Sequence, residues 1–188
     1  MQRYLTIFCS LGIMLLAGCS AAPALISKSA IVPAGVNLSG HWQIREGAET
    51  MRLPASADSD IHSILTSRQS RARSSQRSSG MAAQVFLQFG HSLKITQTDH
   101  GLFISYDRAV VREFTFGENR LVTVGPIEAR RVSGWEDNTF VVETLDTDGT
   151  TLFEHWHLDG AGDVLVRDIR MQKGDKEKFS LTQLFDRK

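Results

Sequence analysis

The stretch that decides the fold is NTFVVETLDTDGTTLFEHWHLD, residues 138–159. Two runs rich in β-branched and aromatic residues flank the turn Asp146–Gly149, whose Asp and Gly residues favour a tight reversal of the chain. The second run alternates, so that one side of an extended strand carries Leu152, Glu154, Trp156 and Leu158. This pattern predicts a β-hairpin that buries one face.

Similar short runs continue from residue 92 to residue 185, each ended by a turn rich in Gly, Asp or Asn. Eight or nine sequential strands of this kind predict an all-β, antiparallel up-and-down meander. Closing such a sheet into a barrel buries one face and removes the exposed strand edges. Pro126 interrupts the long run 120–135 and predicts a bend, an edge or a junction between two strands. The apolar stretch 81–89 fits either a helix or a strand.

The first strand of the predicted domain contains Gly40-His41-Trp42. A Gly-x-Trp motif at the head of the first strand, followed by a meander, resembles the lipocalins and the wider calycin families. It is also similar to small lipocalin-like lipoproteins of proteobacteria that have no assigned function. The resemblance implies a calycin-like barrel over 38–188, in which Gly40 and Trp42 close one end beneath an Arg side chain, with Arg187 as the candidate. It also implies a cavity for a small apolar ligand, although a filled barrel without a ligand fits the sequence equally well.

A long insertion departs from the lipocalin pattern, because residues 47–80 follow the first strand without an obvious second strand. Its part 54–80 is rich in Ser and carries four closely spaced arginines: Arg68, Arg71, Arg73 and Arg77. One interpretation is a solvated, partly disordered loop with a short helix near residues 61–66. The other is a basic arm that contacts anionic lipid head groups or another anionic surface. RNA binding is disfavoured, because the segment has no aromatic residue on which bases would stack.

The N-terminus has the features of a targeting signal. Arg3 precedes the mostly apolar stretch 4–16, which is too short to span a bilayer as a helix, and small residues follow. Leu16-Ala17-Gly18-Cys19 resembles the lipobox of bacterial lipoproteins. The resemblance implies that residues 1–18 are removed and that Cys19 is acylated on its sulfur and its new amine, which anchors a protein durably in a membrane. The alternative is an uncleaved signal anchor, or a plain signal peptide with a coincidental cysteine.

The residues around Cys19 define the rest of the predicted organisation. Ser20 stands where an Asp favours retention in the inner membrane among enterobacterial lipoproteins. The resemblance therefore implies an outer-membrane address in a Gram-negative host, with the domain in the periplasm. The small, aperiodic segment 19–37 predicts a flexible tether before the barrel. Cys9 is lost with the signal peptide, which leaves no thiol for a disulfide, a nucleophile or a metal site in the mature chain.

Candidate catalytic or metal-binding residues are few. His155 and His157 are two positions apart on one strand and point to the same side, so both imidazoles are able to share one metal ion. A third ligand is required, and no spacing selects one among the conceivable residues His41, His91 and Glu143. The alternative is a pair of structural histidines on a polar strand face, opposite residues such as Asp168. The sequence has no Gly-x-Ser-x-Gly motif, no phosphate-binding loop and no Gly-x-Gly-x-x-Gly motif, so we expect no cofactor and no enzymatic activity.

The balance of 21 basic and 21 acidic residues gives no indication of a nucleic-acid partner. The sequence predicts a lipid-anchored lipoprotein of the cell envelope whose barrel binds a small hydrophobic ligand or a partner protein. The first alternative is a structural or assembly lipoprotein that uses its Arg-rich loop. The second, less favoured, is a metal-dependent hydrolase built on His155 and His157.

Overall fold

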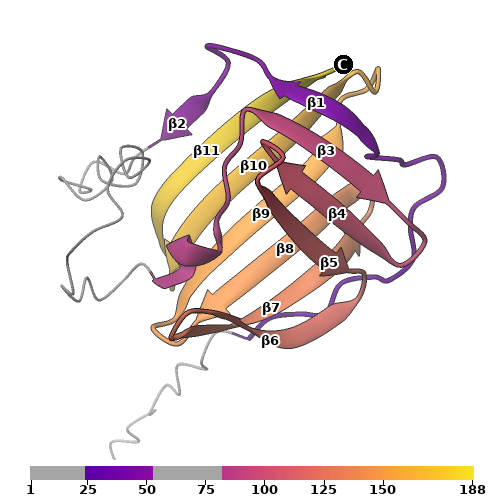
Figure 1. Cartoon of the computed structure of the whole chain (residues 1–188). Coiled ribbons are helices and arrows are strands. Elements are labelled where there is room, and N and C mark those ends of the chain that lie inside the picture. Colours follow the sequence, from indigo (N-terminus) through magenta and orange to yellow (C-terminus); the bar gives the residue numbers. More distant parts are fainter. Residues whose placement is uncertain (1–23, 53–81) are drawn as a thin grey trace, which may run out of the picture.

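The computed structural model describes residues 24–52 and 82–188, which form one antiparallel sheet of eleven strands and one short 3₁₀ helix (Figure 1). Residues 1–23 and 53–81 lie outside the described part. The helix is η1 (Ala82–Phe86). The strands are β1 (Gly40–Ile44), β2 (Thr50–Arg52), β3 (Ser92–Gln97), β4 (Gly101–Tyr106), β5 (Val110–Thr115), β6 (Glu118–Val124), β7 (Ile127–Glu136), β8 (Thr139–Asp146), β9 (Thr150–Leu158), β10 (Val164–Lys173) and β11 (Lys176–Arg187).

The strand order turns the sheet into a nearly closed barrel. Neighbours follow the order β5-β4-β3-β1-β11-β10-β9-β8-β7-β6, and β2 pairs with β11. Because β1 pairs with both β3 and β11, the first strand joins the two halves of the meander. In Figure 1, β1, β3, β4 and β5 lie in front of the layer formed by β7 to β11. The all-β antiparallel meander predicted from the sequence is confirmed.

The strand count is higher than the predicted eight or nine, for two reasons. β2 is only three residues long and lies within the segment 47–80, so the expectation that no second strand follows the first is wrong. β2 continues the pairing of β1 with β11 after a break at residues 45–49. The turn at Gly125 and Pro126 separates β6 from β7, so the run 120–135 contributes to two strands. The stretch 81–89 contains η1 and no strand.

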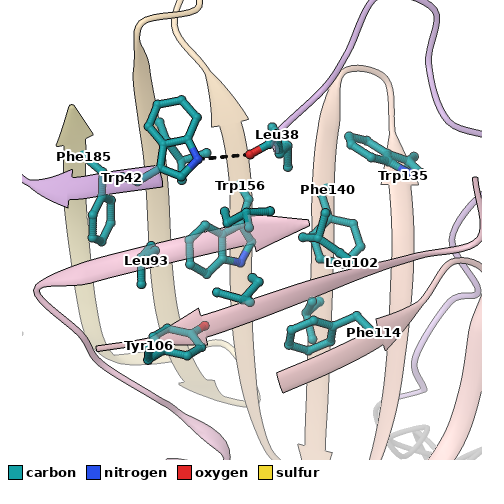
Figure 2. Packing of buried hydrophobic residues seen from close by; sticks show 14 of the residues in the cluster. Leu38, Trp42, Leu93, Leu102, Tyr106, Phe114, Trp135, Phe140, Trp156 and Phe185 are labelled. Carbon is teal, nitrogen blue, oxygen red and sulfur yellow. Dashed lines mark hydrogen bonds between the residues drawn. The ribbon is translucent and has the colours of Figure 1, made fainter. Parts of the chain in front are cut away.

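Inward-facing side chains form two hydrophobic clusters, which occupy different ends of β9 and β10. The first is rich in aromatic residues, and four of its rings pack edge to face with centroids 5.4–5.8 Å apart: Phe114, Phe116, Trp135 and Phe140. Edge-to-face packing is favourable beyond the area it buries. Trp42 belongs to the same cluster, and its Nε1 donates a hydrogen bond to Leu38 O at 3.1 Å (Figure 2). The second cluster lies around η1 and includes Ala83, Phe86, Leu152 and Ile169.

The described sheet is open between β5 and β6, the two strands at the ends of its order. We call this opening the seam. Side chains of β7 bridge it at one end, where Ser133 Oγ donates to Thr115 O at 2.9 Å and Arg131 Nη2 donates to Glu113 O at 3.3 Å. Arg131 is buried and forms an ion pair with Glu118 at 2.7 Å. Side-chain hydrogen bonds thus replace a strand ladder at this end of the seam.

The segment before β1 is attached to the barrel at Ser29. Ser29 and Trp135 exchange two backbone hydrogen bonds, at 3.1 and 2.9 Å. The ammonium of Lys28 lies between the carboxylates of Glu136 and Glu143, at 2.5 and 2.7 Å. The Lys28 side chain is only 5% exposed, and although burial opposes it, the two carboxylates raise the pKa of Lys28. Residues 28 and 29 are therefore fixed to the sheet.

This packing differs from the flexible tether predicted over 19–37. Among the residues described here, Val32 and Val36 also contact the first hydrophobic cluster. Close approach to β7 requires Gly134, because a Cβ there would lie 2.4 Å from Ser29 O. The composition of a small-residue, aperiodic segment suggests flexibility, but it does not reveal a single bridge of this kind to a strand more than 100 residues away. Residues 19–23 lie outside the described part.

Candidate functional site

Three polar side chains meet inside the barrel and form what we call the interior polar cluster: Glu154, Arg167 and Gln183. They come from β9, β10 and β11, which are adjacent, and all three are buried. Arg167 forms an ion pair with Glu154, and its Nη1 donates to Gln183 Oε1 at 3.1 Å. Gln183 Nε2 in turn donates to Glu49 Oε1 at 2.8 Å. A buried charge is tolerated only when it is paired and hydrogen-bonded, as Arg167 is here.

Aromatic rings surround the guanidinium of Arg167. Its central carbon lies 4.5 Å from the ring centroid of Trp156, 5.7 Å from that of Tyr106 and 5.8 Å from that of Phe89. Burial raises the pKa of the Tyr106 hydroxyl, so Tyr106 stays protonated at neutral pH. The interior polar cluster therefore sits in an aromatic environment, where a charged hydrogen bond is stronger than in water.

Two N–H groups beside this cluster lack a hydrogen-bond partner among the described residues: Arg167 Nε and Trp156 Nε1. A third, Trp135 Nε1, lies in the first hydrophobic cluster. A buried donor left unpaired costs about 1–3 kcal/mol. Such groups are rare in folded proteins and call for an explanation, such as an internal water or a bound group.

Residues 82–89, which we call the cap, lie against the barrel next to the interior polar cluster. Three side chains of the sheet hold its backbone. Asp146 Oδ2 accepts from Ala83 N at 3.0 Å, Arg112 Nη2 donates to Phe86 O at 3.1 Å, and Arg167 Nη1 donates to Gln88 O at 2.9 Å. Ala83 and Phe86 are buried in the second hydrophobic cluster. The cap thus supplies apolar side chains to the interior without belonging to the sheet.

A crevice of about 370 Å³ opens along the seam and reaches Phe86 of the cap. Val111 of β5 and Leu121 of β6 line its two sides and are 64% and 60% exposed. Arg112 and Arg131 line it as well. Exposed apolar side chains on two edge strands are unusual, because such edges favour association with other molecules. The seam crevice therefore connects a surface of apolar and charged side chains with the cap.

The structure brings together the three residues expected to close one end of the barrel. The guanidinium carbon of Arg187 lies 4.1 Å from the ring centroid of Trp42. Arg187 also donates to Ser39 O at 3.0 Å and to Gly162 O at 3.2 Å. A Cβ at Gly40 would lie 2.7 Å from Arg187 Nη1 and would displace the guanidinium from the indole. This end is therefore covered by a cation–π contact.

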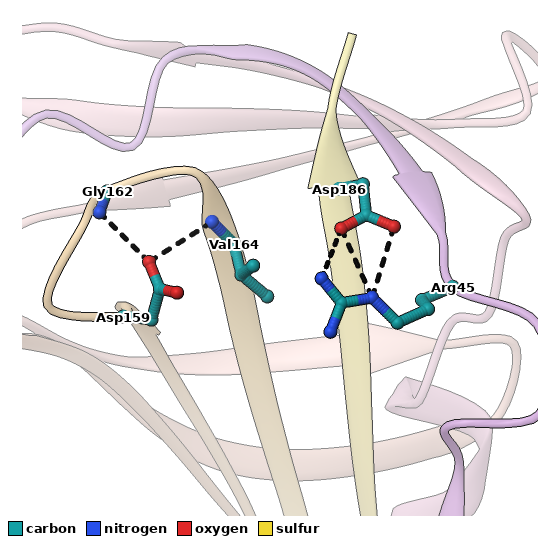
Figure 3. Close-up of polar contacts among 5 residues, drawn as sticks. All are labelled: Arg45, Asp159, Gly162, Val164 and Asp186. Carbon is teal, nitrogen blue, oxygen red and sulfur yellow. Dashed lines mark hydrogen bonds and ion pairs between the residues drawn. The ribbon is translucent and has the colours of Figure 1, made fainter.

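Polar contacts fix the chain around the same end (Figure 3). Asp159 Oδ1 accepts hydrogen bonds from Gly162 N at 2.9 Å and Val164 N at 3.2 Å, which holds the turn before β10. Arg45 forms an ion pair with Asp186 of β11, and this hydrogen-bonded pairing lowers the pKa of Asp186. Both contacts are at the surface and serve to order the chain.

His155 and His157 face outward on β9, away from the interior polar cluster. His155 is directly opposite Asp168 of β10, and burial lowers its pKa. It lines a surface crevice of about 330 Å³, in which Thr182 Oγ1 donates to Asp168 Oδ1 at 2.5 Å. Glu143, one of the three conceivable third ligands, is paired with Lys28. Among the described residues, no group of three His, Cys, Asp or Glu side chains is arranged to hold a metal ion.

Five of the candidate site residues lie outside the described residues: Cys19, Arg68, Arg71, Arg73 and Arg77. The lipid anchor and the contact with an anionic surface therefore stay predictions. Within residues 24–52 and 82–188, no helix has the length and apolar character needed to cross a membrane.

Sequence reasoning did not identify the interior polar cluster, although its signal was present. Glu154 alternates with Leu152 and Trp156, and Arg167 alternates with Leu165 and Ile169. A charged residue at an inward position of two successive strands indicates a buried pair, because neither charge is stable there alone. The cap has no comparable signal, since its hydrogen bonds come from residues distant in sequence.

The chain matches no protein-family model, and no curated protein matches it. Several solved structures resemble it in shape. Lipid binding protein 8 of Caenorhabditis elegans is 11% identical, with a TM-score of 0.48 over 82% of this chain and 100% of that chain. The fatty acid binding protein of Schistosoma mansoni, in complex with arachidonic acid, is 12% identical, with a TM-score of 0.44 over 86% and 98%. A luciferase domain of Lingulodinium polyedrum is 16% identical, with a TM-score of 0.49 over 86% and 45%. These names cover different activities, so shape alone assigns no function to this chain.

Proposed function

We propose that this chain is a lipid-anchored barrel protein that binds one small amphipathic molecule inside the barrel, with the polar end of the molecule at the interior polar cluster. The observation that supports this most is the pair of unpartnered buried donors, Arg167 Nε and Trp156 Nε1. They belong to two side chains in direct contact, since the guanidinium carbon of Arg167 is 4.5 Å from the ring centroid of Trp156. An acceptor oxygen of a bound ligand would satisfy each donor that it reaches.

The charge of the cluster defines the polar end of the ligand. Glu154 already neutralises Arg167, so a carboxylate would bring a second negative charge into a buried site. A neutral acceptor, such as an ester, amide or hydroxyl oxygen, pairs with the free donors without that cost. The rest of the ligand is apolar, because the surrounding side chains include Trp156, Tyr106 and Phe89.

Space for the ligand comes from displacement of the cap. Removing Phe86 from the second hydrophobic cluster would uncover apolar side chains of the barrel, among them Leu152, Ile169 and Leu181. The cap is held by three hydrogen bonds from sheet side chains. The seam crevice leads to Phe86 between apolar and charged side chains, and it is the entry route in this proposal. Ligand binding thus exchanges apolar contacts of the cap for those of the ligand.

The test uses residues 20–188, purified without detergent, which keep every described contact. Titration with a monoacylglycerol, followed by native mass spectrometry, is expected to give one bound molecule per chain, and a fatty acid of equal chain length should bind more weakly. Phe86→Ala should bind the monoacylglycerol more tightly, because the ligand no longer has to displace the ring. Glu154→Leu with Arg167→Met, which removes both charges together, should abolish the preference for the monoacylglycerol. Absence of uptake by both the unmodified chain and Phe86→Ala would contradict the proposal.

The anchor has its own test. Mass spectrometry of the N-terminal peptide from membranes is expected to show acylated Cys19 as the first residue, and Cys19→Ser should keep residues 1–18. A cleaved chain with an unmodified cysteine would contradict the lipoprotein proposal and leave the binding proposal unaffected.

A second candidate function is a filled barrel with a structural or assembly role. The dense interior favours it, since the aromatic rings of the first cluster contact one another directly. It differs from the first candidate in predicting no uptake of amphiphile even after Phe86→Ala.

A further inference from the structure

A basic crevice of about 300 Å³ lies on the outer face of the barrel, across β1, β3 and β4. Its lining includes four basic side chains: His41, Lys94, Arg108 and Lys188. Ser105 adds a hydroxyl group, whereas the hydroxyl of Ser92 donates to Asp107 Oδ1 at 3.3 Å. No acidic residue is among the described residues that line the crevice, although Asp107 adjoins it. None of the residues of the interior polar cluster contributes to it.

The register of the sheet places these groups in one row. His41 of β1 is directly opposite Lys94 of β3, and Lys94 is directly opposite Ser105 of β4. Side chains directly opposite each other in an antiparallel pair have Cβ atoms about 4.5–5.5 Å apart. The ammonium of Lys94 thus stands between an imidazole and a hydroxyl group, and both of these are able to donate a hydrogen bond to an anion bound beside it.

Arg108 reaches the crevice from a strained turn between β4 and β5. Asp107 and Arg108 have φ values of 49° and 58°, and Ala109 N donates to Tyr106 O at 2.9 Å. This is the geometry of a type I′ turn, which strongly favours Gly at its second central position. Asp107 Oδ1 accepts from the backbone N–H groups of His91 and Ser92, both at 2.8 Å, which fixes the turn against β3. An arginine thus occupies a position where glycine is less strained, and such strain is often kept for function.

We propose that this crevice binds a phosphate group, held by the guanidinium of Arg108 and the ammonium of Lys94, with His41 and Ser105 beside them. The proposal does not depend on the interior ligand. It accounts both for the group of basic side chains along the crevice and for an arginine at a turn position that favours glycine.

The chemistry of the two cations favours phosphate over a carboxylate. The guanidinium offers a planar fork of donors that fits two phosphate oxygens, and the ammonium of Lys94 on β3 is available for a further oxygen. A carboxylate has only two oxygens in one plane. The same group is supplied either by a soluble phosphorylated molecule or by the head group of an anionic lipid.

The test uses the full chain in phosphatidylcholine nanodiscs. Calorimetric titration with inorganic phosphate at low salt is expected to show saturable binding, with acetate binding more weakly. In a second arm, discs that contain phosphatidylglycerol should slow hydrogen exchange over residues 105–109 if lipid head groups are the source. Phosphate binding without this protection identifies a soluble ligand.

Variants separate this proposal from a structural role. Arg108→Gly should weaken phosphate binding at least tenfold and also raise the midpoint of thermal unfolding by about 2–4 °C, because it relieves the left-handed strain. Lys94→Gln should weaken binding similarly, whereas the exposed Lys178→Gln on β11 is the matched control and should leave it unchanged. Absence of both phosphate binding and lipid protection would overturn the proposal, as would unchanged binding by Arg108→Gly.

Discussion

Replacement of Arg167 by Met is the substitution that probes the interior polar cluster most sharply. Methionine keeps the length and apolar stem of the side chain but removes the guanidinium. Glu154 then stays buried without its ion-pair partner, and Gln88 O and Gln183 Oε1 lose donors. Removing one partner of a buried ion pair costs about 3–5 kcal/mol. We expect the free energy of unfolding to fall by that amount at pH 7.

The measurement is urea unfolding of residues 20–188, monitored by far-UV circular dichroism. The slope of the free energy of unfolding against urea concentration is compared between variants. The double variant Glu154→Leu with Arg167→Met is the decisive comparison, because it removes both charges and leaves no buried charge unpaired. The double variant should be more stable than Arg167→Met alone and close to the unmodified chain. A loss below about 1 kcal/mol for the single variant, or a double variant that is less stable still, would refute the buried ion pair as a coupled unit.

Three further predictions concern other parts of the barrel. Arg187→Met should lower the free energy of unfolding by about 0.5–1 kcal/mol, measured in urea, because the cation over Trp42 is lost. Ser133→Ala should lower it by about 1 kcal/mol and speed hydrogen exchange in β5, since Thr115 O loses its donor across the seam. Although burial opposes it, hydrogen bonds from the backbone of Ser92 and His91 lower the pKa of Asp107 below 3.8. The ionised carboxylate of Asp107 therefore stabilises the fold above pH 3.8, and this stabilisation is lost as the pH falls through the pKa of Asp107 in the folded protein. Asp107→Asn should flatten the acid limb of a curve of the free energy of unfolding against pH.

The sequence was sufficient for the strands because each one carries its own local signal. The hairpin of β8 and β9 alternates apolar and polar residues and turns at Asp146–Gly149, so its register is determined within 22 residues. β2 lacks such a signal, because three residues are too few to show a period. Its place depends on pairing with β11, more than 120 residues later.

The candidate site was harder to predict, because it is made from contacts between distant segments. Arg167 bonds to Gln88, and Arg112 bonds to Phe86, across separations of 79 and 26 residues. The charged residues at inward positions were visible in the sequence, but their meaning depends on which strands are adjacent. Trp42 and Arg187 were the exception, since a resemblance to a known family pointed to that pair in advance.

The central claim is that a ligand meets Arg167 and Trp156 inside the barrel. The most direct measurement is a two-dimensional ¹H–¹⁵N NMR titration of residues 20–188 with a monoacylglycerol, observing the three indole N–H signals and the Arg167 Nε–H signal. Saturation should shift the signals of Trp156 and Arg167 downfield as both gain an acceptor, while the indole of Trp42, already bonded to Leu38 O, stays in place. A saturated complex in which neither signal moves would contradict the account.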